Sequence, residues 1–303
     1  MTEQELKTLP IAPADNAAME KARQRQAELA KPPGSLGKLE DYSIRLAGIT
    51  GNVKTEIEKC RVIVLAADNG VTAEGVSSAP TSVTLSQVIN MTRHITGMSS
   101  LAYYFGNEVV VADLGIDTDR KIPGVLDRKI RRSTGNIAKE RAMTRQQVLD
   151  AIAVGLDLAA DAAKDGVNAV GVGEMGIGNT TTSSAVLSAL TGATPESVTG
   201  RGGGLTDQAF AVKKQVITQA LALHHPDQED VVDVLSAVGG LDLAAMTGVF
   251  LGCALQHIPA VVDGFISIVA ALCACRLQLR HPVTGKQMTF TCEPEGGAFE
   301  LFY

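Results

Sequence analysis

Apolar residues follow two patterns that alternate along this chain. Short, largely unbroken runs of aliphatic residues at 61–67, 108–112 and 167–172 predict buried strands. Between these runs, apolar residues recur every three or four positions, which predicts helices. A repeated order of strand and helix is typical of an α/β fold in which helices cover both faces of a parallel sheet. We expect helices at 14–30, from about 38, at 84–91, at 100–105, from 144 to about 165, at 180–190, from 206 or 207 to 225, at 241–255 and at 265–279, and a further short buried strand at 259–262.

The run at 167–172 leads into the helix at 180–190 through a glycine-rich loop with one acid, Glu174. Backbone N–H groups and the positive end of a helix dipole converge on such a loop, which suits it to bind a phosphate. A carboxylate among anion donors indicates a ribose hydroxyl or a proton to handle beside that phosphate. The alternative is a turn without a ligand, because glycine serves any tight strand-to-helix connection. The first helical turn adds capping and hydroxyl groups from Asn179, Thr180, Thr181 and Thr182.

A second glycine-rich loop lies at 199–205, and Thr206 or Asp207 caps the helix that follows it. This helix carries Lys213 and Lys214 near its start. A helix N-terminus with glycines and cations favours phosphate for the same reasons as the first loop. The two loops together therefore strengthen the prediction of a phosphate site.

Several other polar positions are open to two interpretations. Asp68 follows the strand at 61–67 and either meets a ligand at the carboxyl edge of the sheet or lies exposed in an Asn-Gly turn. Asp113 likewise follows the strand at 108–112. The basic run at 128–132 is interpreted as a solvated face rather than an anion site, and the turn at 31–37 as a linker.

Composition and charge narrow the class of protein. A net charge of −6 over 303 residues gives no basic surface for nucleic acid. The N-terminus does not resemble a signal peptide, and Asp263 interrupts the most apolar stretch, 258–279, so no membrane span is expected. The five cysteines include no C-x-x-C pair, and the five histidines are scattered. We therefore expect a cytoplasmic protein with neither a metal site nor a bound cofactor.

Three generic motifs provide a test of the first glycine-rich loop. Residues 171–176 fit G-x-G-x-x-G, but no apolar strand ending in an acid follows about 20 residues later, as a dinucleotide-binding unit requires. The chain contains neither the P-loop pattern G-x-x-x-x-G-K-[ST] nor the nucleophile elbow G-x-S-x-G. A dehydrogenase, a P-loop NTPase and an α/β-hydrolase are therefore disfavoured.

Six ordered motifs resemble one family, the nicotinate-nucleotide:dimethylbenzimidazole phosphoribosyltransferases, which activate the lower base of cobamides. The resemblance covers about residues 10–278, and six motifs in order are far more specific than any single glycine loop. The motifs are KPPGSLGKLE (31–40), AADNGVTAEGVS (66–77), GVGEMGIGNTT (171–181), GRGGGL (200–205), GGLDLAAMTG (239–248) and DGFIS (263–267).

The resemblance implies a reaction and an architecture. The reaction moves 5-phosphoribose from nicotinate mononucleotide to 5,6-dimethylbenzimidazole or a related base, and it releases nicotinate and α-ribazole 5′-phosphate with inversion at the anomeric carbon. The implied fold is a three-layer, Rossmann-like large domain at 46–264. Both chain ends, 1–45 and 265–303, would form a small helical domain. The implied assembly is a dimer, either of identical chains or with a paralogue.

Matching motifs also imply which residues form the site. Glu174 would lie at the ribose and the reacting centre, and Lys213 would pair with the 5′-phosphate. The other implied phosphate and ribose contacts are Gly176, Gly178, Asn179, Thr180, Gly202 and Gly203, and the implied base pocket contains Ser77, Ser78 and Gln87.

The C-terminal sequence departs from the family pattern. Members continue past the DGFIS helix to a G-E-G-[TS]-G motif whose glutamate is the general base, whereas residues 276–303 of this chain contain no such motif, and neither Glu293 nor Glu295 matches it. Three hypotheses follow. The reading frame could be shifted or truncated, which would remove the base, or the chain could be a subunit whose paralogous partner supplies the missing residues, as in branches of the family that act on phenolic bases. Alternatively, Glu174 could itself be the base. The chain is therefore either an active phosphoribosyltransferase or a catalytically impaired nucleotide-binding subunit.

Overall fold

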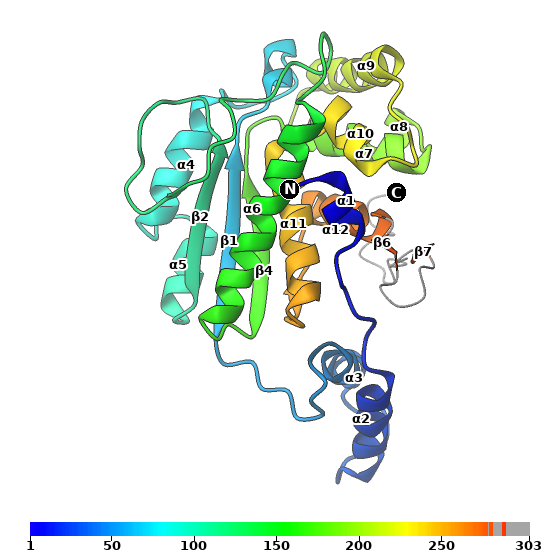
Figure 1. Ribbon diagram of the computed structural model, residues 1–303. Coiled ribbons are helices and arrows are strands. Elements are labelled where there is room, and N and C mark those ends of the chain that lie inside the picture. The colour runs from blue at the N-terminus through cyan, green and yellow to red at the C-terminus, as the bar shows by residue number, and fades with distance from the viewer. Residues whose placement is uncertain (278, 281–286, 289–303) are drawn as a thin grey trace.

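A parallel sheet forms the centre of the molecule (Figure 1). The computed structural model describes residues 1–277, 279–280 and 287–288 of the 303-residue chain. The central sheet has five parallel strands in the order β3-β2-β1-β4-β5, which confirms the predicted α/β class. Its strands are β1 (Cys60–Ala67), β2 (Glu108–Gly115), β3 (Leu126–Asp127), β4 (Ala169–Met175) and β5 (Ala260–Val261), and a separate antiparallel pair is formed by β6 (Leu279–Arg280) and β7 (Gln287–Met288).

Helices pack on both faces of the sheet, and the local sequence signals set their ends. Thr144 forms the predicted capping box with Gln147, and Gly192 ends a helix in the left-handed conformation. The described helices are α1 (Glu3–Lys7), α2 (Asn16–Glu28), α3 (Lys38–Thr50), the 3-10 helix η1 (Gly70–Glu74), α4 (Ser82–Thr92), α5 (Gly97–Tyr104), α6 (Arg145–Lys164), α7 (Asn179–Thr191), α8 (Pro195–Val198), α9 (Asp207–His224), α10 (Val231–Val238), α11 (Leu241–Leu255) and α12 (Phe265–Arg276).

The alternation of side chains along β1 divides the core into two layers. Val64 and Ala66 pack with residues of α4 on one face, while Ile63 and Leu65 pack with α11 on the other. Helix α6 packs closely on α11. The two helices approach so closely at Gly248 that a Cβ atom there would lie 2.1 Å from the carbonyl oxygen of Ile152. Both faces of the central strands are therefore buried, as the apolar runs predicted.

The strand order creates a switch point beside β1. The chain runs from β1 to β2 and β3 on one side, then returns through α6 to β4 on the other side of β1. In sheets of this kind, ligands bind outside the carboxyl ends of the strands where the order reverses. The ends of β1 and β4 are therefore the expected place for a ligand, and α7 to α10 gather at this edge of the sheet (Figure 1).

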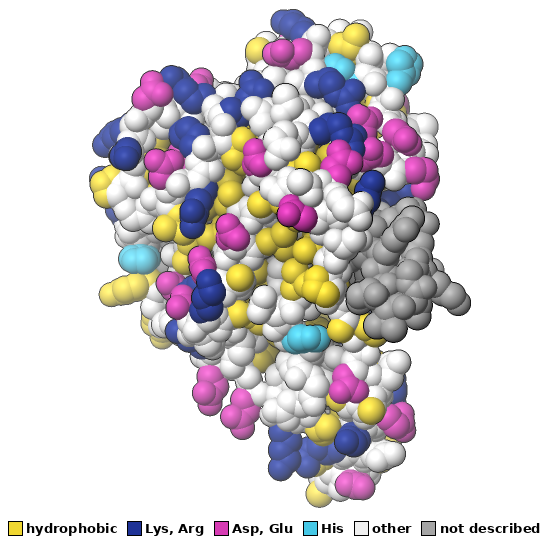
Figure 2. All heavy atoms as spheres, in the orientation of Figure 1, with side chains coloured by type: hydrophobic (Ala, Val, Ile, Leu, Met, Phe, Trp, Pro, Cys, Tyr) yellow, Lys and Arg dark blue, Asp and Glu magenta, His cyan; other side chains and the backbone are white. Residues whose placement is uncertain are grey.

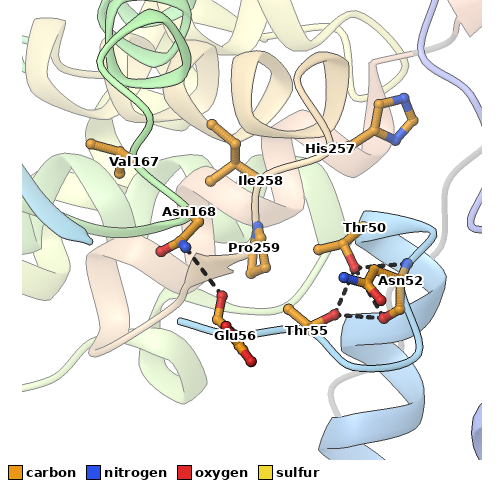
Figure 3. Close-up of a pocket in the computed structure, with 9 residues that line it drawn as sticks. All are labelled: Thr50, Asn52, Thr55, Glu56, Val167, Asn168, His257, Ile258 and Pro259. Carbon is orange, nitrogen blue, oxygen red and sulfur yellow. Dashed lines mark hydrogen bonds between the residues drawn. The ribbon is translucent and has the colours of Figure 1, made fainter. Parts of the chain in front are cut away.

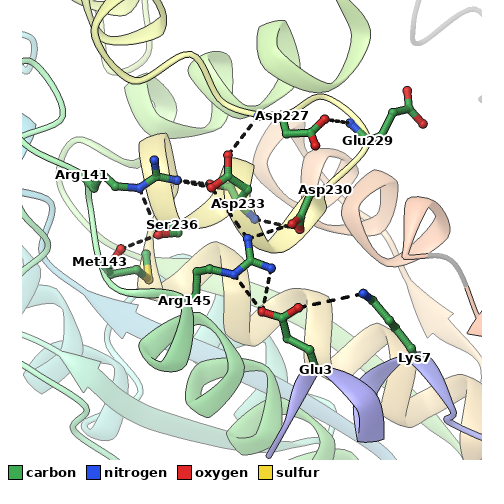
Figure 4. Close-up of polar contacts among 10 residues, drawn as sticks. All are labelled: Glu3, Lys7, Arg141, Met143, Arg145, Asp227, Glu229, Asp230, Asp233 and Ser236. Carbon is green, nitrogen blue, oxygen red and sulfur yellow. Dashed lines mark hydrogen bonds and ion pairs between the residues drawn. The ribbon is translucent and has the colours of Figure 1, made fainter.

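The N-terminal helices are attached to the sheet layers in two ways. Helices α2 and α3 pack on each other around Ala18, Ala22 and Ala47, at some distance from the sheet (Figure 1). Helix α1 instead reaches α6, where Arg145 forms ion pairs with Glu3 at 2.7 Å and with Asp230 at 2.8 Å (Figure 4). Helix α12 packs against α11, α7 and β4. The division of the chain at residues 45 and 264 stays a prediction.

Three expectations about individual elements need correction. The sequence predicts a buried strand at 259–262, but β5 pairs with β4 at only two positions and Val261 is 56% exposed, because no described strand pairs with the outer side of β5. Asp113 lies within β2 instead of after it. The last helix ends at Arg276, earlier than predicted. Glu293 and Glu295 lie outside the described residues.

Charged side chains of both signs lie on the surface of the molecule (Figure 2). Acidic and basic side chains are interspersed across the upper part of the face in Figure 2. In the basic run at 128–132, Lys129 pairs with Asp113 at 2.9 Å and Arg132 pairs with Asp117 at 2.8 Å. Among the described helices, none combines the length and the apolar character that crossing a membrane would require.

Candidate active site

The first glycine-rich loop connects β4 to α7, as predicted. Gly178 caps α7 with a φ of +94°, a left-handed conformation that favours glycine. No side chain makes a cap hydrogen bond at this end, so the capping expected from residues 179–182 is wrong. Gly176 is required for a different reason, because a Cβ atom there would lie 2.2 Å from the carbonyl oxygen of Ala67. The loop therefore packs directly on the end of β1 and brings the first turn of α7 to the switch point.

Glu174 lies at the end of β4 and is fixed by the helix that follows. The amide nitrogen of Asn179 donates to Oε2 of Glu174 at 2.5 Å. Burial raises the pKa of Glu174 to about 7, and the charge of Asp242 adds to this rise, while the hydrogen bond from Asn179 opposes it. A carboxyl group with this pKa exchanges a proton readily near neutral pH, which suits a general acid or base.

Lys213 provides a buried positive charge between the two glycine-rich loops. Its side chain is fully buried on α9, and its Nζ donates to Oγ1 of Thr180 at 2.8 Å and to the carbonyl oxygen of Gly200 at 2.9 Å. Both acceptors are uncharged, and burial lowers the pKa of Lys213 to about 8. A buried ammonium group that meets only neutral acceptors among the described residues is costly, and a bound anion would offset that cost.

The second glycine-rich loop closes around the same lysine. Gly202 has a φ of +56°, and a Cβ atom there would lie 3.0 Å from Oγ1 of Thr180 and 3.6 Å from Nζ of Lys213. The hydroxyl of Ser78 donates to the carbonyl oxygen of Gly203 at 3.1 Å. The structure therefore brings together Thr180, Lys213, Gly202, Gly203 and Ser78, which come from four separate segments of the chain.

Two predicted base-pocket residues have less direct links to these loops. Oγ of Ser77 accepts a hydrogen bond from the N–H of Ala79 within its own turn, at 3.2 Å. Gln87 lies on α4, three residues after Thr84 and therefore on the same helix face. Oγ1 of Thr84 accepts from the N–H of Ile177 at 3.1 Å. The face of α4 that carries Gln87 thus adjoins the β4–α7 loop.

The structure adds buried polar residues that the sequence interpretation did not place in the site. Asp68 is only 3% exposed, so the exposed-turn interpretation is wrong, and its Oδ2 accepts from the N–H of Asp117 at 2.8 Å. Asn69 is 1% exposed, and Asp242 in the first turn of α11 is fully buried. The signal for Asp242 was available in the sequence as the one acid within the otherwise uncharged helix at 241–255.

A separate cavity of about 250 Å³ lies at the opposite, amino-terminal edge of the sheet (Figure 3). Glu56, Asn168 and Pro259 line it, and each of them precedes a strand. None of the predicted site residues lines this cavity. In the part of the chain that the structure describes, no group of three or more His, Cys, Asp or Glu side chains is arranged to hold a metal ion.

Comparisons with known proteins agree with this geometry. A family model described as "Phosphoribosyltransferase" (DBI_PRT) matches residues 11–284. The nicotinate-nucleotide--dimethylbenzimidazole phosphoribosyltransferase of Clostridium perfringens is 49% identical over 277 residues, which are 91% of this chain and 76% of that protein. The protein of the same name from Geobacter metallireducens is 46% identical over 268 residues, 88% of this chain and 76% of that one.

A solved structure shows the same likeness in three dimensions. The crystal structure of CobT from Thermus thermophilus superposes with a TM-score of 0.82 at 38% sequence identity, covering 86% of this chain and 78% of that one. The family match covers most of the chain and includes both glycine-rich loops, which meet around Lys213. The chain belongs to the nicotinate-nucleotide:dimethylbenzimidazole phosphoribosyltransferase family.

Proposed function

We propose that this chain transfers the 5-phosphoribosyl group of nicotinate mononucleotide to 5,6-dimethylbenzimidazole or a related base. The products are nicotinate and α-ribazole 5′-phosphate. The observation that carries the proposal is the buried ammonium group of Lys213, which lies between two glycine-rich loops, together with the carboxyl of raised pKa at the end of β4. A phosphate and a reacting ribose beside it are the ligand that this combination of charges fits.

The proposed binding roles follow from the positions of the loops. The phosphate would accept hydrogen bonds from Lys213, from Thr180 and from backbone N–H groups where α7 begins. Gly176 and Gly178 allow the chain to turn into that helix, and Asn179 orients Glu174. Gly202 and Gly203 would cover the nucleotide from the second loop, while Ser77, Ser78 and Gln87 would line the base pocket.

The proposed chemistry needs little covalent assistance. Nicotinate carries a positive charge on its ring nitrogen while it is bonded to ribose, and it leaves as a neutral pyridine ring when the bond to C1′ breaks. The incoming azole nitrogen forms the new bond at C1′ from the opposite face, which inverts the anomeric carbon. The azole must then give up its N–H proton to a base. Glu174, ionised above a pH of about 7, is proposed as that base.

Turnover of nicotinate mononucleotide with 5,6-dimethylbenzimidazole tests the proposal. We expect the wild-type chain to form α-ribazole 5′-phosphate and Glu174→Gln to lose at least about 100-fold in kcat, because the amide cannot accept the proton. Glu196→Gln is the matched control, since Glu196 is exposed on α8. Below a pH of about 7, the wild-type rate should fall about tenfold per pH unit as Glu174 becomes protonated.

Binding without turnover would lead to a different conclusion. If the chain binds nicotinate mononucleotide but neither a benzimidazole nor a phenol is converted, the catalytic role is wrong, and a nucleotide-binding subunit that needs a partner chain is supported. Wild-type turnover that Glu174→Gln retains would remove Glu174 from the role of base while leaving the reaction in place. A homodimer or a heterodimer with a paralogue, and a cytoplasmic location, stay predictions.

A further inference from the structure

A buried carboxyl group without a complete set of partners lies beneath the proposed site. Asp242 is the second residue of α11, and its side chain is fully buried. Oδ1 accepts a hydrogen bond from the N–H of Leu243 at 2.8 Å. Oδ2 is buried and makes no hydrogen bond of ordinary geometry among the described residues, and the side chain of Asn69 is the neighbour that favours its charged form. Buried polar atoms are nearly always hydrogen-bonded, so this oxygen requires an explanation.

The position of Asp242 is set by two glycines. A Cβ atom at Gly240 would lie 2.3 Å from Oδ1, and one at Gly176 would lie 2.9 Å from Oδ2. The unpartnered oxygen is therefore directed at the β4–α7 loop. Along β4, Val170 and Val172 pack in the same core cluster as α11. Side chains alternate along a strand, so Glu174 projects from that same face, toward the start of α11.

The charged groups that face Asp242 are of one sign. Glu174 approaches from β4 and Asp68 from the end of β1, and each interacts unfavourably with its charge. The nearest cations of the neighbouring elements have other partners, since Lys213 donates to Thr180 and Gly200 and Lys129 pairs with Asp113. Burial raises the pKa of Asp242 to about 7.

The missing hydrogen-bond donor can be identified from the atoms around Asp242. Oδ1 of Asp68 and Oδ1 of Asn69 are also buried without partners in the described part of the chain. The amide of Asn69 acts on Asp242 and the hydroxyl of Thr84 acts on Asp68. Three buried acceptors exceed these two donors, which indicates a further proton on one of the carboxyl groups. A neutral carboxyl group at Asp242 would supply that donor and would remove one negative charge from the vicinity of Glu174.

We propose that Asp242 is a positioning residue that shares one proton with Glu174, so that Asp242 stays neutral while Glu174 is the ionised carboxylate that faces the substrate. Asp242 does not touch the substrate in this arrangement. The proton that leaves the azole goes to Glu174, which makes both carboxyls neutral, and one proton returns to solvent after the product leaves. The catalytic consequence rests on the proposed function, whereas the shared proton does not.

The pH dependence of turnover tests the catalytic consequence. In the proposed state Asp242 is already neutral when Glu174 is ionised, and Asp242→Asn keeps a neutral side chain there at every pH, so we expect the acidic limb of kcat/KM to stay within about half a unit of its wild-type position, with KM nearly unchanged. Asp263→Asn is the matched control, because Asp263 is exposed after β5. A shift of the acidic limb to lower pH by more than about half a unit in an active, folded Asp242→Asn protein would mean that Asp242 is ionised beside Glu174 in the wild-type chain, and it would overturn the proposal.

Carboxyl titration followed by ¹³C NMR, without substrate, tests the shared proton itself. In the wild-type chain, two coupled steps are expected for Glu174 and Asp242, and in Glu174→Gln the Asp242 carboxyl should titrate at lower pH, because its repulsive neighbour is gone. An identical Asp242 titration in both proteins would contradict the pair. This measurement needs neither turnover nor a folded Asp242 variant, so it separates a failure of the pair from a failure of the proposed function.

Discussion

The two edges of the sheet treat buried charge differently. At the amino edge, Arg61 on β1 is buried, and its guanidinium forms ion pairs with Glu108 and Asp165, each at 2.6 Å. At the carboxyl edge, Lys213 and Asp242 are at least as deeply buried, yet neither contacts a group of opposite charge among the described residues. The same scaffold therefore balances the buried charge of Arg61 at the amino edge and leaves Lys213 and Asp242 at the carboxyl edge without a counter-charge among the described residues.

This difference separates structural polar groups from functional ones. The side-chain amide of Asn168 donates to the carbonyl oxygen of Glu56 (Figure 3) and accepts from the N–H of Lys59, so the polar groups of this residue beside the amino-edge cavity are satisfied. Glu174 and Lys213, in contrast, have pKa values displaced toward neutral pH, which is the property expected of a site that binds and reacts.

Replacing Lys213 should produce the largest effect on ligand binding. In Lys213→Met we expect the affinity for nicotinate mononucleotide to fall about 10- to 100-fold, because the charged hydrogen bond to the phosphate is lost. Titration calorimetry would measure this change. Lys214→Met is the control, because it removes a neighbouring lysine whose Nζ lies 4.3 Å from the centroid of the Phe210 ring instead of between the two loops.

The same variant also tests the unbalanced charge. In the wild-type chain, Kd for nicotinate mononucleotide should rise above a pH of about 8 as Lys213 loses its proton, and Lys213→Met should lack this dependence. Unchanged affinity in Lys213→Met would mean that Lys213 has a structural role, and the contrast between the two edges would no longer identify the site.

The buried carboxyl groups at the carboxyl edge should also make the free energy of unfolding depend on pH, and we expect this effect to be smaller than the effect of Lys213→Met on binding. The folded pKa values of Glu174 and Asp242 are raised, so the folded chain holds protons that the unfolded chain releases between a pH of about 4.5 and about 7. The free energy of unfolding should therefore fall as the pH rises through this window. Urea midpoints at pH values of about 5, 6 and 7 would show the decrease.

Glu174→Gln provides the comparison for that measurement. With one titrating group removed, its stability should fall less steeply with pH than that of the wild-type chain. Glu74 and Asp165 have lowered pKa values and act in the opposite direction, but their contribution is nearly complete by a pH of about 5. Equal slopes for the two proteins would show that Glu174 does not hold its proton in the folded state.

Local sequence signals predicted most of the scaffold. Thr144 and Gly192 act within a few residues of their own positions, so the capping box and this helix end were visible in the sequence. The glycine-rich loops indicated phosphate for the same reason. These predictions were successful because a helix end or a tight turn depends on its immediate neighbours.

Features that depend on distant segments were less accessible. The sequence gives no sign that Lys213 is buried, because its acceptors Thr180 and Gly200 lie on other segments. The burial of Asp242 could not be predicted for the same reason, since the residues that surround it lie at the ends of β1 and β4. The short run that contains β5 is apolar, but burial depends on a covering neighbour, and the described part of the chain provides none for this edge strand.

The amino edge should be the least sensitive to substitution. Asp165→Asn removes one of the two partners of Arg61, and we expect a loss of less than about 1 kcal/mol in the free energy of unfolding, because the Asp165 side chain is half exposed and Arg61 keeps Glu108. Urea denaturation measures the loss, and turnover should be unchanged. A loss well above about 1 kcal/mol in the free energy of unfolding would mean that Arg61 needs both of its partners. The ion pairs at the amino edge would then be critical to folding. A loss of activity would show that the two edges are coupled through β1, so that charge balance alone does not separate structure from function.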